Sequence, residues 1–313
     1  KGWLPVSDDA VADVGVAPAT QKGIFGFGYL GSSTYTGATN LVSSSGVVAT
    51  DTTAVGTARS ATAAATYGGD KAIFGFGNDS GLYSLTNLVS NSGVVASDTT
   101  GVGTARYSLA ATGYGLSGQA IFCFGLASSP ASGVNTRNLV NSSGVVATDA
   151  AGAGTARSSK AARYGSTGQA IACYGYLTGS EVYTAITNLI SNTGVVASDT
   201  AGVGTARECA VSSYGGDKAI SAFGYGGGRI NTRNLISNTG VVGSTVSGAG
   251  TAQNARASTN YGGDKAIFAY GFNGSANTSI SNLVSNLGVV ASDTTGVGTA
   301  RQSPSAAGYS YAA

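Results

Sequence analysis

Short apolar stretches separated by polar, glycine-rich turns run along the whole chain. Four typical stretches are residues 85–90, 94–97, 107–114 and 120–124. Each is rich in β-branched, aromatic or small residues, and clusters of Gly, Ser and Asn divide it from the next. Apolar residues at helical spacing do not recur over any useful length. The pattern predicts an all-β protein with four short strands in about 48 residues.

The same pattern returns six times. An Ile-containing segment recurs at steps of 49, 48, 50, 49 and 47 residues, beginning at Ile24, Ile73, Ile121, Ile171, Ile220 and Ile267. An Asn-Leu-Val or Asn-Leu-Ile triplet follows each one, at Asn40, Asn87, Asn138, Asn188, Asn234 and Asn282. Six residues further on, a Gly-Val-Val triplet starts at Gly46, Gly93, Gly144, Gly194, Gly240 and Gly288. Self-similarity at a fixed period is the signature of a repeat architecture.

A Gly-Thr-Ala-Arg tetrad ends 13 residues after that glycine. Its last residues are Arg59, Arg106, Arg157, Arg207 and Arg301, with Gln253 in the fifth copy. These two distances never vary, whereas the span from tetrad to Ile is 13 to 15 residues and the span from Ile to Asn is 14 to 17. Because insertions are tolerated in exposed connections, fixed spans predict packed framework and variable spans predict loops.

Four short strands per unit, repeated six times, predict a six-bladed β-propeller with four-stranded blades. A β-helix fits less well because its rungs are far shorter. The expected organisation is an N-terminal extension over residues 1–13 and a propeller over residues 14–313.

The chain's last segment repeats the spacing of a first strand. Arg301 lies 8 residues before Tyr309, as Arg59 lies 8 residues before Tyr67. We therefore expect the C-terminal strand to pair into the N-terminal blade and close the ring. Residues 14–20 compete for that place. The start at Lys1, without Met or an apolar signal core, indicates a processed chain or a piece of something larger.

The order of features in one unit resembles the kelch repeat over nearly the whole chain. An arginine, a small-residue strand, a turn, an apolar strand ending in Gly, a variable loop and two more strands follow one another. The letters depart from the usual kelch pattern: Gly-Phe-Gly replaces a Gly-Gly doublet, Leu41 and Leu88 stand where an aromatic is usual, and the only Trp is Trp3. The chain is also similar to Gly-rich, kelch-like arrays of phage virion proteins, particularly of phages that infect marine cyanobacteria. This resemblance implies a virion location; without it we expect an extracellular one.

Composition removes several classes of function. The 16 basic and 14 acidic residues nearly cancel, which argues against nucleic-acid binding, and no apolar stretch is long enough to insert into a membrane. Histidine is absent, so Ser-His-Asp triads and His-ligated metals are excluded, including the copper of kelch-fold radical oxidases. The three cysteines are expected to be small buried residues: Cys123, Cys173 and Cys209. We expect no cofactor and no metal.

Repeated charges point to structure rather than chemistry. An aspartate stands 8 residues before the arginine in five copies, giving the pairs Asp51 and Arg59, Asp98 and Arg106, Asp149 and Arg157, Asp199 and Arg207, Asp293 and Arg301. We interpret the aspartate as a loop cap and the arginine as a tie to a neighbouring blade. The fifth copy carries Thr245 and Gln253 and so has lost both together, as a paired structural role predicts. The Gly-x-Gly-Thr-Ala-Arg stretch lacks the Gly-Lys ending of a phosphate loop.

The variable loop between the second and third strands is the expected binding surface. Aromatic and charged residues stand there among Ser, Gly and Asn, a mixture typical of recognition surfaces. The candidates are Tyr29, Tyr35, Tyr83, Arg137, Tyr176, Tyr183, Arg229 and Arg233.

These features favour a rigid, non-enzymatic module for assembly or attachment, which the resemblance places in a tail fibre, tail tip, neck or capsid appendage. Its expected partners are other virion proteins or a glycan or protein of the host surface. One alternative is a secreted or cellular carbohydrate-binding lectin. A third is a glycan-cleaving enzyme, for which the acids outside the framework are Asp79, Glu181 and Glu208.

Overall fold

The computed structural model describes residues 19–128 and 131–313. Within these ranges the chain is all-β, which confirms the predicted class, and holds no helix that could cross a membrane. Its strands form six three-stranded antiparallel sheets and one two-stranded hairpin.

We number the three-stranded sheets in chain order. Sheet 1 consists of β20 (Ser305–Tyr309), β1 (Lys22–Gly31) and β2 (Thr34–Val42), sheet 2 of β3 (Ala63–Tyr67), β4 (Lys71–Gly75) and β5 (Thr86–Val89), and sheet 3 of β6 (Ala110–Tyr114), β7 (Gln119–Cys123) and β10 (Arg137–Val140). Sheet 4 consists of β11 (Lys160–Tyr164), β12 (Gln169–Leu177) and β13 (Val182–Ile190), sheet 5 of β14 (Glu208–Tyr214), β15 (Lys218–Tyr225) and β16 (Arg229–Ile236), and sheet 6 of β17 (Ala257–Tyr261), β18 (Lys265–Phe272) and β19 (Asn277–Val284). The small hairpin pairs β8 (Leu126–Ala127) with β9 (Ser132–Gly133).

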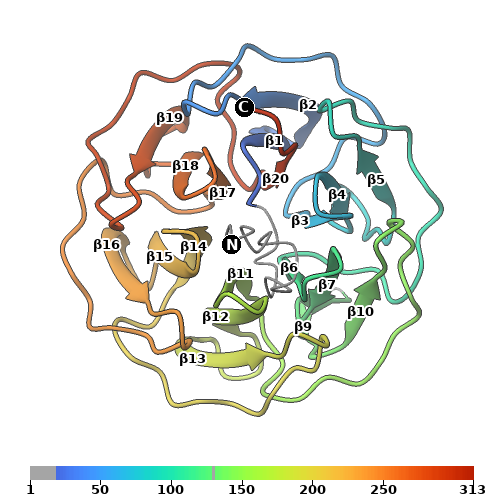
Figure 1. Cartoon of the computed structure of the whole chain (residues 1–313), viewed down its shortest axis with the longest axis vertical. Coiled ribbons are helices and arrows are strands. Elements are labelled where there is room, and N and C mark those ends of the chain that lie inside the picture. Colours follow the sequence, from blue (N-terminus) through green and yellow to red (C-terminus); the bar gives the residue numbers. More distant parts are fainter. Residues whose placement is uncertain (1–18, 129–130) are drawn as a thin grey trace, which may run out of the picture.

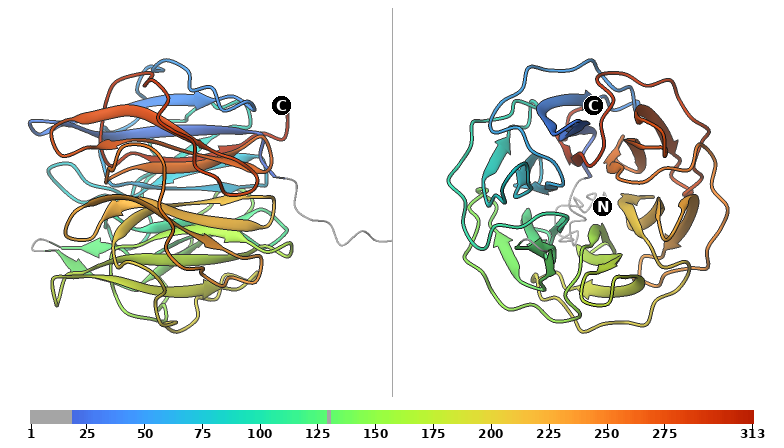
Figure 2. Two further views of the ribbon diagram at one scale, coloured as in Figure 1. Left: turned by 90° about the vertical axis from the view of Figure 1, so that its left-hand side faces the viewer. Right: turned by 180° about the vertical axis from the view of Figure 1, so that it is seen from behind.

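The sheets surround a central axis (Figure 1). The strands nearest that axis are β20, β3, β6, β11, β14 and β17. Each contacts the innermost strand of both neighbouring sheets, so the contacts run once around the axis and return to their start. Seen from the side, the strands run along the axis (Figure 2). We name the two ends of the molecule the hairpin face, where the second strand turns into the third, and the turn face, where the first turns into the second.

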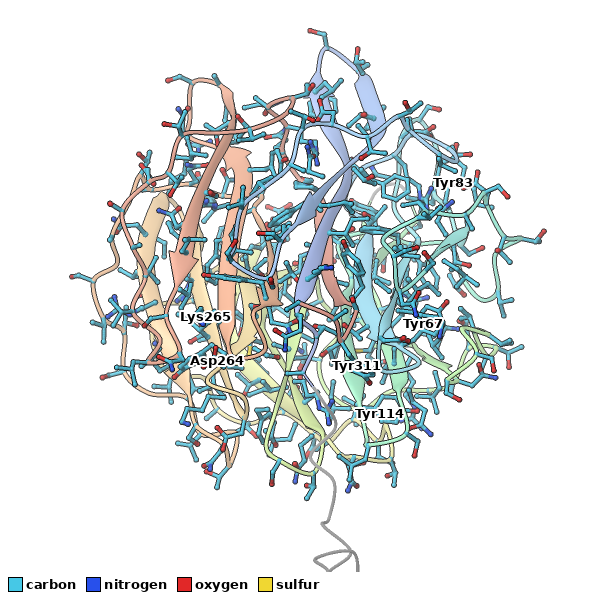
Figure 3. The ribbon with its side chains drawn as sticks, turned by 45° about the horizontal axis from the view of Figure 1, so that its top comes forward. Tyr67, Tyr83, Tyr114, Asp264, Lys265 and Tyr311 are labelled. Atoms are coloured by element: carbon cyan, nitrogen blue, oxygen red, sulfur yellow. The ribbon has the colours of Figure 1, made fainter. Side chains whose placement is uncertain are left out.

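Apolar side chains pack between neighbouring sheets and fill the space between the ribbons (Figure 3). Between sheets 2 and 3, for example, buried Ile73 and Phe76 meet Leu109 and Phe122. The rings of Phe76 and Phe122 meet edge to face with centroids 5.1 Å apart, a favourable arrangement for aromatic pairs. The predicted burial of the cysteines is confirmed for Cys123, Cys173 and Cys209.

Sheet 1 joins the two ends of the chain. Strand β20 pairs antiparallel with β1, in a register that sets Lys22 opposite Tyr309 and Gly26 opposite Ser305. The expected pairing of the C-terminal strand with the first Ile segment is confirmed. Most of the competing segment, residues 14–20, and the expected extension over residues 1–13 lie outside the described residues.

The prediction of a fourth strand in each unit is wrong. In sheet 2 the outer segment touches β5 only through isolated bridges, Val89 to Val95 and Thr86 to Thr99. The outer segment has one residue more than β5 between these bridges, so a regular ladder cannot continue. The side-chain amide of Asn87 holds it instead, donating to the Ala96 carbonyl at 3.1 Å and to Asp98 at 2.9 Å.

The variable segment is strand rather than loop in four sheets. The paired strands β1 and β2, β12 and β13, β15 and β16, and β18 and β19 extend to 8–10 residues each. A bulge interrupts each pair at an aromatic residue with positive φ, such as Tyr174 at 55°, before a glycine. Bulges bend a strand and re-aim its side chains, so these buried rings point between the sheets while the hairpin continues beyond them.

Candidate functional site

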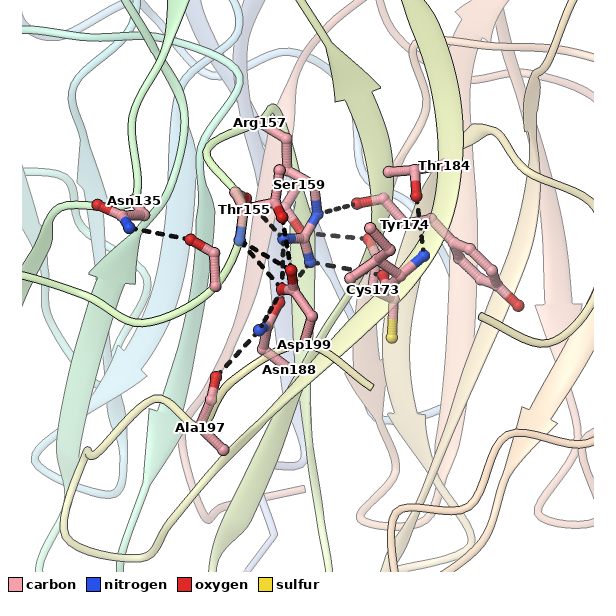
Figure 4. A network of polar contacts seen from close by, with 12 residues as sticks. Asn135, Thr155, Arg157, Ser159, Cys173, Tyr174, Thr184, Asn188, Ala197 and Asp199 are labelled. Atoms are coloured by element: carbon pink, nitrogen blue, oxygen red, sulfur yellow. Dashed lines mark hydrogen bonds and ion pairs between the residues drawn. The ribbon is translucent and has the colours of Figure 1, made fainter. Parts of the chain in front are cut away.

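The repeated arginines are fully buried and belong to the framework (Figure 4). Arg157 donates from Nε to the Tyr174 carbonyl at 2.9 Å, from Nη1 to the Thr155 carbonyl at 3.0 Å and from Nη2 to Asn188 Oδ1 at 2.7 Å. Asn188 in turn donates to Asp199, which also accepts from the backbone and hydroxyl of Thr155. A buried guanidinium needs this many acceptors, because each unpaired donor would cost free energy.

The aspartate beside each arginine comes from the following repeat, not from the one expected. The Nη1 to Oδ1 distances are 3.7 Å for Arg59 and Asp98, 4.0 Å for Arg106 and Asp149, 4.0 Å for Arg157 and Asp199, and 3.8 Å for Arg301 and Asp51. The prediction of pairs 8 residues apart is therefore wrong. The crossing segment that ends in the arginine enters a new sheet, and the outer segment of that sheet supplies the carboxylate.

Each arginine also contacts the preceding sheet. The guanidinium carbon of Arg59 lies 4.3 Å from the ring centroid of Phe27 in sheet 1, and Arg157 lies 4.5 Å from that of Phe124 in sheet 3. Cation–π contacts of this kind are strongest when desolvated. The interpretation of the arginine as a tie between neighbouring sheets agrees with this geometry.

The fifth copy requires a second correction, because Thr245 and Gln253 are not partners of each other. Thr245 accepts from Asn234, which binds Arg207. Gln253 instead precedes sheet 6, where Arg256 takes the arginine's place: its Nη1 donates to Asn282 Oδ1 at 2.7 Å, and its guanidinium carbon lies 4.1 Å from the centroid of Phe223.

The candidate binding residues of sheets 1 and 2 lie together on the hairpin face. The rings of Tyr29 and Tyr35 are 5.2 Å apart, and the Tyr35 hydroxyl donates to the Asp79 carbonyl in the next sheet at 3.2 Å. Tyr83 donates to the Asp79 carboxylate at 2.9 Å. Desolvation raises the pKa of Asp79, but hydrogen bonds from Gly81 and Tyr83 outweigh it and lower the pKa overall. Asp79 thus stabilises its own hairpin.

Two candidates lie away from these rims. Arg137 and Arg233 occupy strands β10 and β16, not loops. Arg233 donates to the Ser247 carbonyl at 2.6 Å, and the buried Nε of Arg137 has no hydrogen-bond partner among the described residues. Neither belongs to the surface that the other candidates form.

Sheets 4, 5 and 6 carry a row of partly exposed rings on the hairpin face, which we name the aromatic belt: Tyr176, Tyr183, Tyr225, Arg229 and Phe272. Ring centroids are 5.1 Å apart for Tyr176 and Tyr183 and 5.6 Å for Tyr183 and Tyr225. The Arg229 guanidinium carbon lies 5.7 Å from the centroid of Tyr225 and 4.7 Å from that of Phe272. Three sheets thus share one surface.

Tyr225 and Phe272 were not among the binding residues expected from the sequence, although a signal for them exists. The residue after the glycine of the Ile segment is aromatic in four repeats: Tyr29, Tyr176, Tyr225 and Phe272. An exposed aromatic at one repeat position is therefore the pattern that finds the belt.

A cavity of about 90 Å³, which we name the axial pocket, lies at the axis beside the hairpin face. Every sheet contributes one residue near the start of its innermost strand: Ala61, Ser108, Ser158, Glu208, Ala255 and Ser303. Lys160 and Arg256 also line it. Burial lowers the pKa of Lys160, and the Glu208 carboxylate opposes that shift. A larger cavity of about 170 Å³ continues along the innermost strands towards the turn face.

Sequence reasoning missed Lys160 and Arg256. Lys160 stands where four other repeats place alanine: Ala63, Ala110, Ala210 and Ala257. A charged residue at a small-residue position was the available signal. Of the three acids outside the framework, only Glu208 lines this pocket, at the beginning of β14.

Neither a scan against protein-family models nor a search of curated proteins finds a match to this chain.

Proposed function

We propose that the chain is a six-bladed, kelch-like β-propeller that acts as a non-enzymatic binding module. The repeated sheets around one axis, the cycle of contacts between their innermost strands and the pairing of β20 with β1 support the propeller. The buried arginines support a rigid frame, because their hydrogen bonds fix each crossing segment to the sheet that follows.

The aromatic belt is the observation that carries the binding role. Its rings are partly exposed, they belong to three sheets, and the Arg229 guanidinium joins two of them. Rings held by a rigid frame provide apolar contact area at little cost in conformational entropy, which suits stacking on sugar rings or on protein side chains.

The resemblance to phage virion proteins makes attachment to a host-surface glycan or protein, or to another virion protein, the proposed setting. A secreted lectin of the same fold uses the same surface, so the two are separated by whether the chain purifies with particles. A glycan-cleaving enzyme requires turnover that is lost in Asp79→Asn or Glu181→Gln.

The binding role is tested by screening the protein on glycan and host-surface arrays with Tyr183→Ala and Tyr225→Ala. We expect each substitution to weaken the best ligand about tenfold or more, since a stacked ring in a binding centre contributes roughly 1–2 kcal/mol. Tyr311→Ala is the control, because Tyr311 follows β20 on the turn face and is 41% exposed. Unchanged binding by both belt variants, or no ligand on either array, contradicts the proposal.

A further inference from the structure

Backbone hydrogen bonds join most neighbouring sheets at the axis beside the hairpin face. Ala61 donates to the Ser303 carbonyl at 2.9 Å, Ser108 donates to that of Ala61 at 2.9 Å, Ser159 to that of Ser108 at 3.2 Å and Ser303 to that of Ala255 at 2.8 Å. Among the described residues, no equivalent bond joins sheet 5 to sheet 4 or to sheet 6. The ring of bonds is therefore open on the side of sheet 5.

Polar side chains line that opening. Glu208 accepts from the Ser158 hydroxyl at 2.6 Å. Lys160 makes no hydrogen bond or ion pair with any residue in the described ranges. Arg256 is 5% exposed, and its two Nη groups donate to Asn282 and to the Phe268 carbonyl, while its buried Nε has no partner among the described residues.

The charge balance of the pocket favours an anion. Two cationic side chains line it against one carboxylate, and one oxygen of that carboxylate already accepts from Ser158. Desolvation lowers the pKa of Lys160, and it lowers the pKa of Arg256 to about 9. Both groups lack a full complement of acceptors, so an anion in the pocket would relieve an existing cost of burial.

The pocket borders the aromatic belt. Glu208 lies opposite Tyr225 in the pairing of β14 with β15, and its charge contributes to raising the pKa of Tyr183. The volume of about 90 Å³ corresponds to roughly three water molecules, which suits a carboxylate group and not a whole sugar. A sugar ring on the belt could thus place a carboxylate substituent in the pocket.

We propose that the axial pocket and the aromatic belt together bind an acidic saccharide, with the sugar ring against Tyr183 and Tyr225 and its carboxylate beside Lys160. Glu208 then accepts hydrogen bonds from sugar hydroxyls. This proposal rests on the proposed binding role of the belt and adds the ligand class.

The test compares three probes by calorimetry: galacturonate, neutral galactose and the acyclic acid galactonate. We expect galacturonate to bind at least tenfold more tightly than either of the others. Lys160→Met should remove its advantage over galactose, and Tyr183→Ala should weaken both cyclic sugars. Lys265→Met is the matched control, since that lysine pairs with Asp264 on the turn face. Lysine labelled with ¹³C at the ε carbon gives a second measurement on the unmodified protein, in which the Lys160 pKa should rise when galacturonate is added.

Galacturonate binding no tighter than galactose, with both lost in Tyr183→Ala, overturns the acidic-saccharide proposal and leaves the binding role of the belt intact. Equal binding of galactonate and galacturonate, insensitive to Tyr183→Ala, also overturns it, because the pocket would then be an anion site that uses no sugar ring. An unchanged Lys160 signal with saturating galacturonate has the same consequence.

Discussion

A buried guanidinium in this protein is stabilised by neutral groups more than by its aspartate. Arg59 lies 3.7 Å from the Asp98 carboxylate, yet its nitrogens donate at 2.7–2.9 Å to Phe76, Thr57 and Asn87. Burial lowers the pKa of Arg59 to about 10, so it stays charged near neutral pH. The aspartate acts mainly through Thr57, whose backbone and hydroxyl donate to it. Its role is to fix the crossing segment.

Sheet 5 lacks this aspartate, and restoring it should stabilise the protein. Thr245 accepts from the Thr205 backbone at 3.2 Å, where other repeats present a carboxylate. We expect Thr245→Asp to raise the free energy of unfolding by about 0.5–1 kcal/mol at pH 7, measured by chemical denaturation. Thr245→Asn is the control, which keeps the shape without the charge and should gain less.

The pH dependence of that gain follows from the aspartates already present. In Asp98, for example, desolvation raises the pKa, but hydrogen bonds from Thr57 and Asn87 outweigh it and lower the pKa overall. A folded pKa below the unfolded value of about 3.9 means that the stabilisation is present above pH 4 and is lost as the pH falls through the folded pKa. A gain in Thr245→Asp that persists at pH 2 would contradict this account.

At the scale of the strand and turn, the framework depends on a glycine that fits against a neighbouring sheet. The Gly-Val-Val turn of sheet 3 begins at Gly144, with φ at +85°. A Cβ there would lie 2.9 Å from both Leu88 and Tyr67, the last residue of β3 (Figure 3). The backbone conformation and the close approach both require glycine.

Gly144→Ala should therefore destabilise the protein by about 2–4 kcal/mol. The thermal unfolding midpoint is the measurement. Gly179→Ala serves as the control: no atom lies within 4 Å of its added Cβ, and its φ is not in the left-handed region, so the midpoint should hardly change. Equal midpoints for the two variants would mean that the turn does not depend on this contact.

At the scale of the whole molecule, the ends of the chain are joined non-covalently. Strand β20 pairs with β1 and contacts β3 and β17, so three sheets depend on it. Its removal would leave an open edge on β1, and open strand edges favour association between molecules.

Deleting residues 302–313 should thus abolish cooperative unfolding and produce aggregates, followed by circular dichroism and size-exclusion chromatography. Deleting only Ala312 and Ala313 should leave both measurements unchanged. A permuted chain that begins with residues 302–309, linked through Gly-Gly-Asp to Thr20, should recover the fold because it restores the strand order of the other sheets. A soluble, cooperatively unfolding chain without residues 302–313 would refute the role given to β20.

The sequence by itself determined the all-β class, the six repeats, the buried cysteines and the pairing of β20 with β1, because strand propensity and fixed spacing are local properties of the chain. It did not determine which aspartate meets which arginine: in nearly identical repeats, Arg59 has equally plausible partners in Asp51 and Asp98, and only the path of the crossing segment chooses. The missing fourth strand, the aromatic belt and the axial pocket were likewise decided by the tertiary structure. Each depends on side chains from different repeats meeting in space, as Tyr183 and Tyr225 do, or on one side chain such as Asn87 replacing a backbone ladder.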